Sequence, residues 1–269
     1  MTTYETYFKD FIGRAEKLSA VKRYRAYDTM FYRTNLATHS KRVGWQTMAL
    51  LAMLPDDIRQ TLDQEKILLL AWVHDDHEIF AGDHQSASEW HMTRQQCTDQ
   101  ETKEAWAVEK TAKIFPHQLG RHVYHDLLAE AVRVDTIESQ LVKLADKIEG
   151  CGEALHEIFG GNVGFTVEVK DPDHDYGKTN PIPPVYYGHY FDHLPKKLPL
   201  LEPWRAFLVP PLVSCHDNIN FSELAALHTP HTRASLDIPI GFAPYDYWKA
   251  TFLASGSEDE IHQLFVRAG

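Results

Sequence analysis

Apolar side chains recur at helical spacing through most of the chain from residue 6 to residue 162. Residues 36–54 follow this pattern and stop at Pro55, which predicts one helix. A second helix is predicted over residues 63–81, because Gly82 can provide the left-handed backbone that commonly ends a helix.

Two further helices are predicted from signals at their ends. Residues 98–101, Thr-Asp-Gln-Glu, match a capping box and predict a helix that ends before Pro116. Residues 135–138 have the pattern of another helix start, and that helix is expected to reach the Gly-Gly-Asn stretch at residues 160–162. The patterns predict a helical core over residues 1–162.

The composition changes after residue 162. Residues 163–269 contain most of the prolines and remain rich in aromatic side chains, so this part is irregular but not disordered by composition. Residues 164–170 predict a weak strand, and residues 258–266 predict a short helix. We therefore expect an all-α bundle with an irregular Pro- and aromatic-rich C-terminal extension, residues 163–269, packed on the core.

Bulk properties exclude several classes of protein. A formal net charge of −11 over 269 residues argues against general binding to nucleic acid or anionic membranes. No apolar run approaches the ~20 residues that span a bilayer, and the N-terminus has no signal-peptide core. The three cysteines, Cys97, Cys151 and Cys215, form no disulfide framework or zinc ribbon, which favours a cytoplasmic protein.

Side chains that bind metals lie in three of the apolar segments. His74 and Asp75 follow an apolar run, while His39 and Asp146 are each embedded in a helical pattern. Two imidazoles and two carboxylates suit one divalent ion, and Mn, Co, Ni, Fe and Zn all accept such mixed ligands. The set predicts metal-assisted hydrolysis.

Two carboxylates need a closer argument. Asp146 alone would be explained by an ion pair with Lys143 or Lys147, but the histidines and Asp75 elsewhere in the chain favour metal ligation. Glu78 would lie one helical turn after His74, where a carboxylate can take a proton from water or give one to a leaving group.

These residues resemble a known family. The set of His39, the His74–Asp75 pair and Asp146 is similar to the site of HD-domain metal phosphohydrolases, and closest to the HD-domain 5′-deoxynucleotidases. The similar stretches are His-Asp-x-x-Glu-x-x-x-Gly-Asp at residues 74–83, Arg-Thr-x-x-x-x-His-Ser at residues 33–40, Glu-Lys at residues 109–110 and Leu-Val-Lys-x-Ala-Asp at residues 141–146. The resemblance covers about residues 8–162.

The resemblance implies a role for each matching residue. Four would hold the metal: His39, His74, Asp75 and Asp146. Glu78 would be the acid/base residue, and Asp75, besides holding the metal, would also be catalytic. Arg23 would contact the phosphate, and Asp83 would face the 2′ position of the sugar. Tyr24 replaces the family's usual tryptophan, and residues 84–87 depart from its Thr-Pro turn, so the sugar pocket is expected to differ.

The predicted function is hydrolysis of small nucleotides, foremost of 5′-deoxynucleoside monophosphates to deoxynucleoside and phosphate. A deoxynucleoside triphosphate triphosphohydrolase, which releases tripolyphosphate, is the alternative, because the metal site does not distinguish one phosphate from three. Alarmone hydrolysis ranks lower, since relatives with that activity carry Asp where this chain has Ile79.

Two alternatives change the class of function. A di-iron oxygenase would need more histidine ligands, and candidates lie between the His74–Asp75 pair and Asp146, among them His84, His91, His117, His122 and His125. A nucleotide-binding protein without activity is the other. A homodimer is expected from the resemblance alone.

Overall fold

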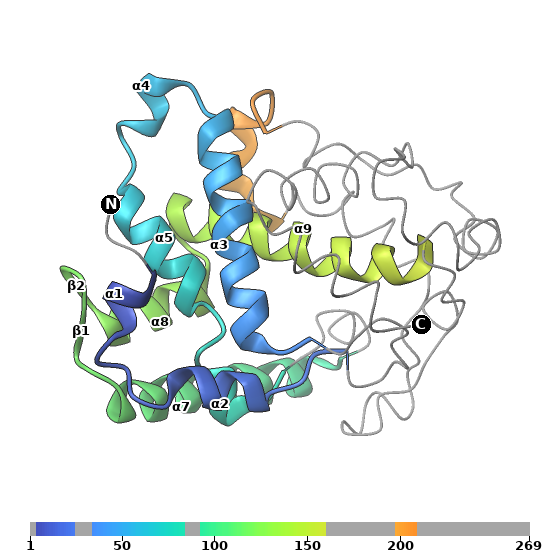
Figure 1. Cartoon of the computed structure of the whole chain (residues 1–269). Helices are drawn as coiled ribbons and strands as arrows, with labels where there is room; N and C mark the ends of the chain where they lie inside the picture. The colour runs from blue at the N-terminus through green and yellow to red at the C-terminus, as the bar shows by residue number, and fades with distance from the viewer. Residues whose placement is uncertain (1–3, 25–33, 84–91, 160–196, 209–269) are drawn as a thin grey trace.

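Three helices form the centre of the fold in this computed structural model, which describes residues 4–24, 34–83, 92–159 and 197–208. These helices are α3 (Leu36–Met53), α5 (Gln64–Val73) and α9 (Ile137–Phe159), and each packs against the other two (Figure 1). Leu50 of α3, Leu70 of α5 and Leu144 of α9 are fully buried. The prediction of an all-α core is confirmed.

The α3 helix matches the predicted range, residues 36–54, to within one residue. Its first turn is capped by Asn35, whose side chain accepts a hydrogen bond from the Thr38 backbone N–H at 3.1 Å, and it stops before Pro55. Gly44 brings α3 and α5 into close contact, because a Cβ at this position would overlap the indole of Trp72. The helix carrying His39 therefore lies directly against the helix leading to His74.

The prediction of one helix over residues 63–81 is wrong. The chain forms α5, a tight turn over residues 74–77, and the short α6 (Glu78–Ala81). Side chains take carbonyls that a continuing helix would use: His74 Nδ1 donates to the Ala71 oxygen, and Arg14 Nη2 donates to the Trp72 oxygen. The backbone tightens to i+3 hydrogen bonds, such as that from the Asp76 N–H to the Val73 oxygen at 2.9 Å.

The start of the next helix, α7 (Arg94–Ile114), is also corrected. Its capping box is formed by Thr93 and Gln96, whereas Thr98 lies inside the helix and donates to the Arg94 carbonyl at 3.1 Å. The predicted end before Pro116 is confirmed. The predicted helix start at residues 135–138 is also confirmed, because α9 begins at Ile137.

The remaining described elements surround the three central helices. They are α1 (Tyr4–Phe8), α2 (Arg14–Ala20), α4 (Asp56–Arg59), β1 (Gln118–Leu119), β2 (His122–Val123), α8 (Tyr124–Arg133) and the 3₁₀ helix η3 (Pro199–Trp204). The β1–β2 hairpin was not predicted, and it turns at Gly120, which has a φ of +59°. No helix of the described segments is long and apolar enough to cross a bilayer.

One piece of the extension is described, and it packs on α9. Leu198, Leu201 and Leu208 are buried in the core, and the Leu200 N–H donates to Gln140 Oε1 of α9 at 2.9 Å. The strand predicted at residues 164–170 and the helix predicted at residues 258–266 lie outside the described residues. The division at residue 162 stays a prediction.

Candidate metal centre

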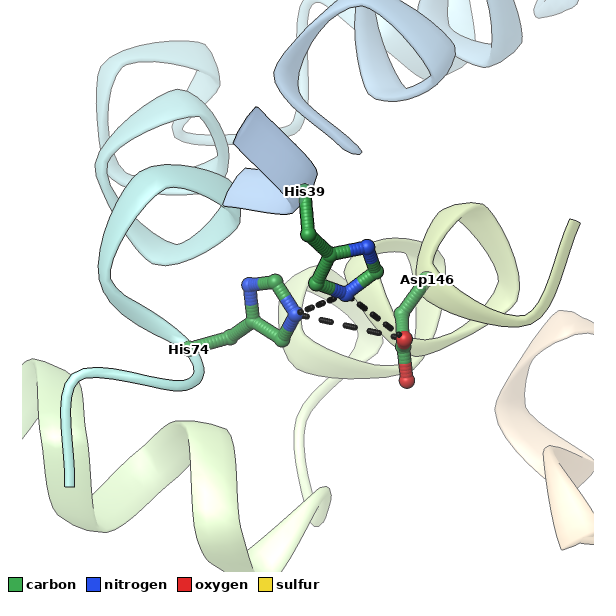
Figure 2. A group of neighbouring side chains, drawn as sticks. All are labelled: His39, His74 and Asp146. Atoms are coloured by element: carbon green, nitrogen blue, oxygen red, sulfur yellow. Dashed lines mark hydrogen bonds and ion pairs between the residues drawn. The ribbon is translucent and has the colours of Figure 1, made fainter. Parts of the chain in front are cut away.

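The structure brings the four predicted ligands together from three segments. His39 extends from α3, His74 from the turn after α5, and Asp146 from α9 (Figure 2). Asp75 follows His74 in the same turn. His39 Nε2 lies 3.3 Å from His74 Nε2 and 3.2 Å from Asp146 Oδ1. Asp75 Oδ2 lies 3.3 Å from His39 Nε2 and 3.2 Å from His74 Nε2. Their metal-ligand role stays a proposal.

The hydrogen bonds of the two rings fix which nitrogen faces the centre unprotonated. His74 Nδ1 donates to the Ala71 carbonyl at 2.9 Å, and a carbonyl can only accept. His39 Nδ1 contacts the carboxylate of Glu149, which also accepts. In its neutral form, each ring therefore keeps its proton on Nδ1 and presents the lone pair of Nε2 to the centre.

This arrangement fits a cation. The Nε2 atoms of His39 and His74 lie 3.2–4.0 Å from each other and from the nearest oxygens of Asp75 and Asp146. Ligand atoms that share an ion through bonds of about 2.1 Å lie roughly 3 to 3.5 Å apart. The buried group of His39, His74 and Asp146 can hold a metal ion, and Asp75 adds a fourth acceptor.

Asp146 divides its carboxylate between two environments. Oδ1 faces the histidines, whereas Oδ2 lies 3.0 Å from Lys143 Nζ and 3.2 Å from Lys147 Nζ. Burial alone would raise the pKa of the Asp146 carboxyl, but the two lysines hold it well below its usual range. The ion pair and the position at the centre, which the sequence presents as alternatives, coexist on the two oxygens.

A buried ionic network lies behind His39. Arg23 Nη1 is 3.0 Å from Glu149 Oε2 and 2.7 Å from Glu153 Oε2, while Arg42 Nη1 is 3.6 Å and 3.7 Å from the same two residues. Although burial alone raises the pKa of the Glu149 carboxyl, His39 and Arg23 lower it to about 2. Two arginines thus balance two glutamates beside the ring of His39.

Glu78 and Asp83 add acidic groups close to the centre. Glu78 is buried at the start of α6, and its Oε2 has no hydrogen-bond partner among the described residues. Burial and the neighbouring charges of Asp75 and Asp83 raise the pKa of Glu78 well above its usual value. Gly82, with a φ of +77°, ends α6 and leads into Asp83, which interacts electrostatically with Arg23.

Tyr24 is anchored to α9. Its hydroxyl donates to the Gly150 carbonyl, and the Arg23 guanidinium lies 5.1 Å from the centre of its ring. The backbone of Tyr24 has a φ of +53°, which is uncommon for a residue other than glycine. The predicted substrate residues Arg23 and Tyr24 therefore lie together against the helix that carries Asp146.

A second buried network supports the His74–Asp75 turn from below. Arg14 forms a paired contact with Asp76, with Nε 2.7 Å from Oδ2 and Nη2 2.6 Å from Oδ1. The Tyr124 hydroxyl donates to Asp76 Oδ2 at 2.6 Å. These residues fix the backbone of the turn but do not reach the central atoms.

The sequence reasoning did not identify these supporting residues. Glu149 follows Asp146 by three positions and Arg42 follows His39 by three, so each lies on the same helical face as a predicted ligand. That spacing was an available signal. The partner of Asp76 was not readable from sequence, because Arg14 is 62 residues away.

A di-iron oxygenase would need extra histidine ligands at the centre, and the structure tests only the candidates that lie in its described residues. Three of them are described and lie outside the cluster: His117, His122 and His125. His125 instead contacts Glu109 Oε1 at 2.7 Å, and His122 lies 3.7 Å from Asp63 Oδ2. His84 and His91 lie outside the described residues. So does the stretch at residues 84–87 that departs from the family motif.

Comparison with known proteins agrees with this geometry. The profile of the YfbR-like family, described as 5′-deoxynucleotidase YfbR-like, matches residues 10–186. A 5′-deoxynucleotidase of Vibrio parahaemolyticus is 28% identical over 139 residues, which cover 52% of this chain and 70% of that protein. The 5′-deoxynucleotidase YfbR of Escherichia coli is 29% identical over 131 residues, covering 49% of this chain and 64% of its own length. The chain thus matches less than two thirds of some relatives.

Among solved structures, a conserved hypothetical protein from Pyrococcus furiosus aligns with a TM-score of 0.47 at 22% identity, covering 76% of this chain and 98% of that protein.

The helical bundle and the cluster around His39 define an HD-domain protein. Within that class, the chain belongs to the YfbR-like 5′-deoxynucleotidase family, because the family profile matches well over half of its residues.

Proposed function

We propose that this protein is a divalent-metal-dependent phosphohydrolase that converts 5′-deoxynucleoside monophosphates to deoxynucleoside and phosphate. The proposal is carried by one observation: the Nε2 atoms of His39 and His74 lie 3.2–4.0 Å from each other and from carboxylate oxygens of Asp75 and Asp146, and the buried carboxyl group of Glu78 is close by. Membership of the YfbR-like family supports the reaction class and implies a nucleotide substrate.

The four converging side chains would hold one divalent ion of the Mn, Co, Ni, Fe or Zn type. Such an ion supplies positive charge for the phosphoryl oxygens and lowers the pKa of a bound water. The charges of Lys143 and Lys147 on the outer oxygen of Asp146 add to the cationic character of this side of the centre.

Glu78 is assigned the proton transfer. Hydrolysis breaks the bond between phosphorus and the 5′ oxygen, and the departing oxygen needs a proton. Burial and the carboxylates of Asp75 and Asp83 favour the protonated form of Glu78, which is the form that can donate. Water contributes the new oxygen of the phosphate product.

Arg23 and Asp83 are assigned to binding. A guanidinium is always charged and presents paired donors in a plane, which suits a phosphate group. Arg23 would bind the phosphate. Asp83, which interacts electrostatically with Arg23, would contact the sugar. Tyr24 would border the sugar in place of the family's usual tryptophan.

A nucleotide panel tests the proposal. Deoxynucleoside mono-, di- and triphosphates and their ribonucleotide counterparts would be incubated with the protein and Mn(II), Co(II) or Ni(II), and the products identified. Release of phosphate from dAMP is expected. Tripolyphosphate from dATP, with dAMP inert, would instead establish the triphosphohydrolase alternative, and a fully inert panel would revive a binding function.

Metal content separates hydrolysis from oxygenation. One metal ion per chain is expected, whereas two irons per chain would contradict the assignment. The cytoplasmic location, the homodimer and the absence of nucleic-acid and membrane partners stay predictions.

A further inference from the structure

The ring of His39 lies between two carboxylates of one helix. Asp146 Oδ1 is 3.2 Å from Nε2 on one side, and Glu149 contacts Nδ1 on the other. The two carboxylates are three residues apart on α9, so they share a face of that helix. Both nitrogens of the His39 ring thus face carboxylates of the same helix.

Glu149 itself is held in place. Its side chain is completely buried, and Arg23 and Arg42 approach it at 3.0 Å and 3.6 Å. A buried carboxylate between two guanidinium groups stays ionised, because the protonated form would leave both cations without their partner. The hydrogen bond from His39 Nδ1 is therefore made to a charged acceptor.

We infer that Glu149 is a positioning residue for His39: it holds the proton on Nδ1, directs the Nε2 lone pair at the centre, and thereby strengthens divalent-metal binding. The inference rests on the metal site of the proposed function. A carboxylate that accepts the second N–H of a ligating imidazole fixes the ring and makes the ligand nitrogen more basic, and its removal commonly weakens metal affinity. Nothing in the resemblance assigned a role to this residue.

Glu153 provides a matched control. It lies one turn further along α9, is also buried, and pairs with the same two arginines at 2.7 Å and 3.7 Å. It makes no contact with His39 among the described interactions. Replacing Glu153 with Gln therefore removes a carboxyl group from the same network without touching the imidazole.

The experiment compares Glu149→Gln, Glu149→Asp and Glu153→Gln in the full chain. Affinity for Mn(II) alone is measured by calorimetry, without nucleotide. Both Glu149 variants should bind Mn(II) about 10 to 100 times more weakly, since Gln lacks the charge and Asp is too short to reach Nδ1. Glu153→Gln should bind as the wild type does.

A second measurement reads the tautomer directly. Although burial alone lowers the pKa of the His39 ring, the carboxylates beside it raise that pKa, so long-range ¹H–¹⁵N correlation spectra of the metal-free protein would be recorded at a pH high enough to make the ring neutral. They should show His39 protonated on Nδ1 in the wild type and in Glu153→Gln. A mixture of tautomers is expected in Glu149→Gln. This measurement needs no metal, so it tests the role of Glu149 even if the wild type binds no ion. Failure of the wild type to bind an ion would contradict the proposed function and leave the tautomer result intact.

The inference is overturned if both Glu149 variants bind Mn(II) as tightly as the wild type. It is equally overturned if Glu153→Gln weakens binding as much as Glu149→Gln. Thermal unfolding of the metal-free proteins completes the comparison: loss of folding confined to both Glu149 variants would show a structural role in place of a positioning one.

Discussion

Asp76, in the turn that carries His74 and Asp75, forms a buried, bidentate ion pair with Arg14. The side chains of Arg14 and Asp76 are 2% and 0% exposed, and Arg14 also donates to the Trp72 carbonyl. The pair connects the start of α2 to the turn that follows α5. It explains why the backbone leaves the helix just before the predicted ligands.

Breaking this pair is expected to destabilise the protein strongly. Asp76→Asn leaves the guanidinium of Arg14 buried without its countercharge, and loss of one partner of a buried pair costs about 3–5 kcal/mol. Urea unfolding measures the change. The control is Asp56→Asn, which disrupts a surface ion pair with Arg59 and should change stability little. Equal effects of the two substitutions would contradict the structural role of Asp76.

Glu78 and Asp75 should separate turnover from metal binding. Glu78→Gln is expected to lower kcat by roughly 10²–10⁴, because the amide cannot donate the proton to the departing oxygen as readily. Its affinity for Mn(II) should persist, whereas Asp75→Ala should lose both activity and metal. Calorimetry and phosphate release would be measured on each variant. Normal turnover by Glu78→Gln would remove it from the mechanism.

Lys147 should oppose the metal that its neighbour binds. Its ammonium is 3.2 Å from Asp146 Oδ2, so it competes electrostatically with a cation at the other oxygen. Lys147→Met is expected to strengthen Mn(II) binding by about threefold or more, since a repelling charge is removed from a poorly solvated site. Lys113→Met, at the end of α7, is the control. Weaker binding by Lys147→Met would mean that the lysine orients Asp146.

Gly150 should control the position of Arg23. A Cβ there would lie 3.2 Å from Arg23 Nη2 and 3.7 Å from the Tyr24 hydroxyl. Arg23 has little room to move, because Glu149 and Glu153 hold it. Gly150→Ala is thus expected to raise KM for dAMP with a smaller change in kcat.

The thermal stability of Gly150→Ala provides the comparison. Alanine in place of a helical glycine favours the helix by about 0.5–1 kcal/mol, which should offset part of the crowding. An unchanged KM in a well-folded variant would indicate that Arg23 does not place the phosphate.

Local patterns predicted the helices and the candidate ligands. Apolar periodicity and Pro55 set the bounds of α3, and ligand-type residues inside buried segments pointed to one centre. The break after Val73 could not be predicted, because it depends on Arg14 reaching the Trp72 carbonyl across 58 residues. The position of the capping box was ambiguous for a different reason, since two stretches around residues 93 and 98 fit the same motif.

The piece of chain at residues 197–208 has a practical consequence. Its three leucines fill space against α9, the helix that supplies Asp146 and Glu149. A truncation after residue 162 would remove these leucines and expose to water the apolar side chains that they cover. Such a shortened polypeptide is expected to precipitate or to lose the position of α9. This would happen even though every proposed metal-binding, catalytic and substrate-binding residue would still be present.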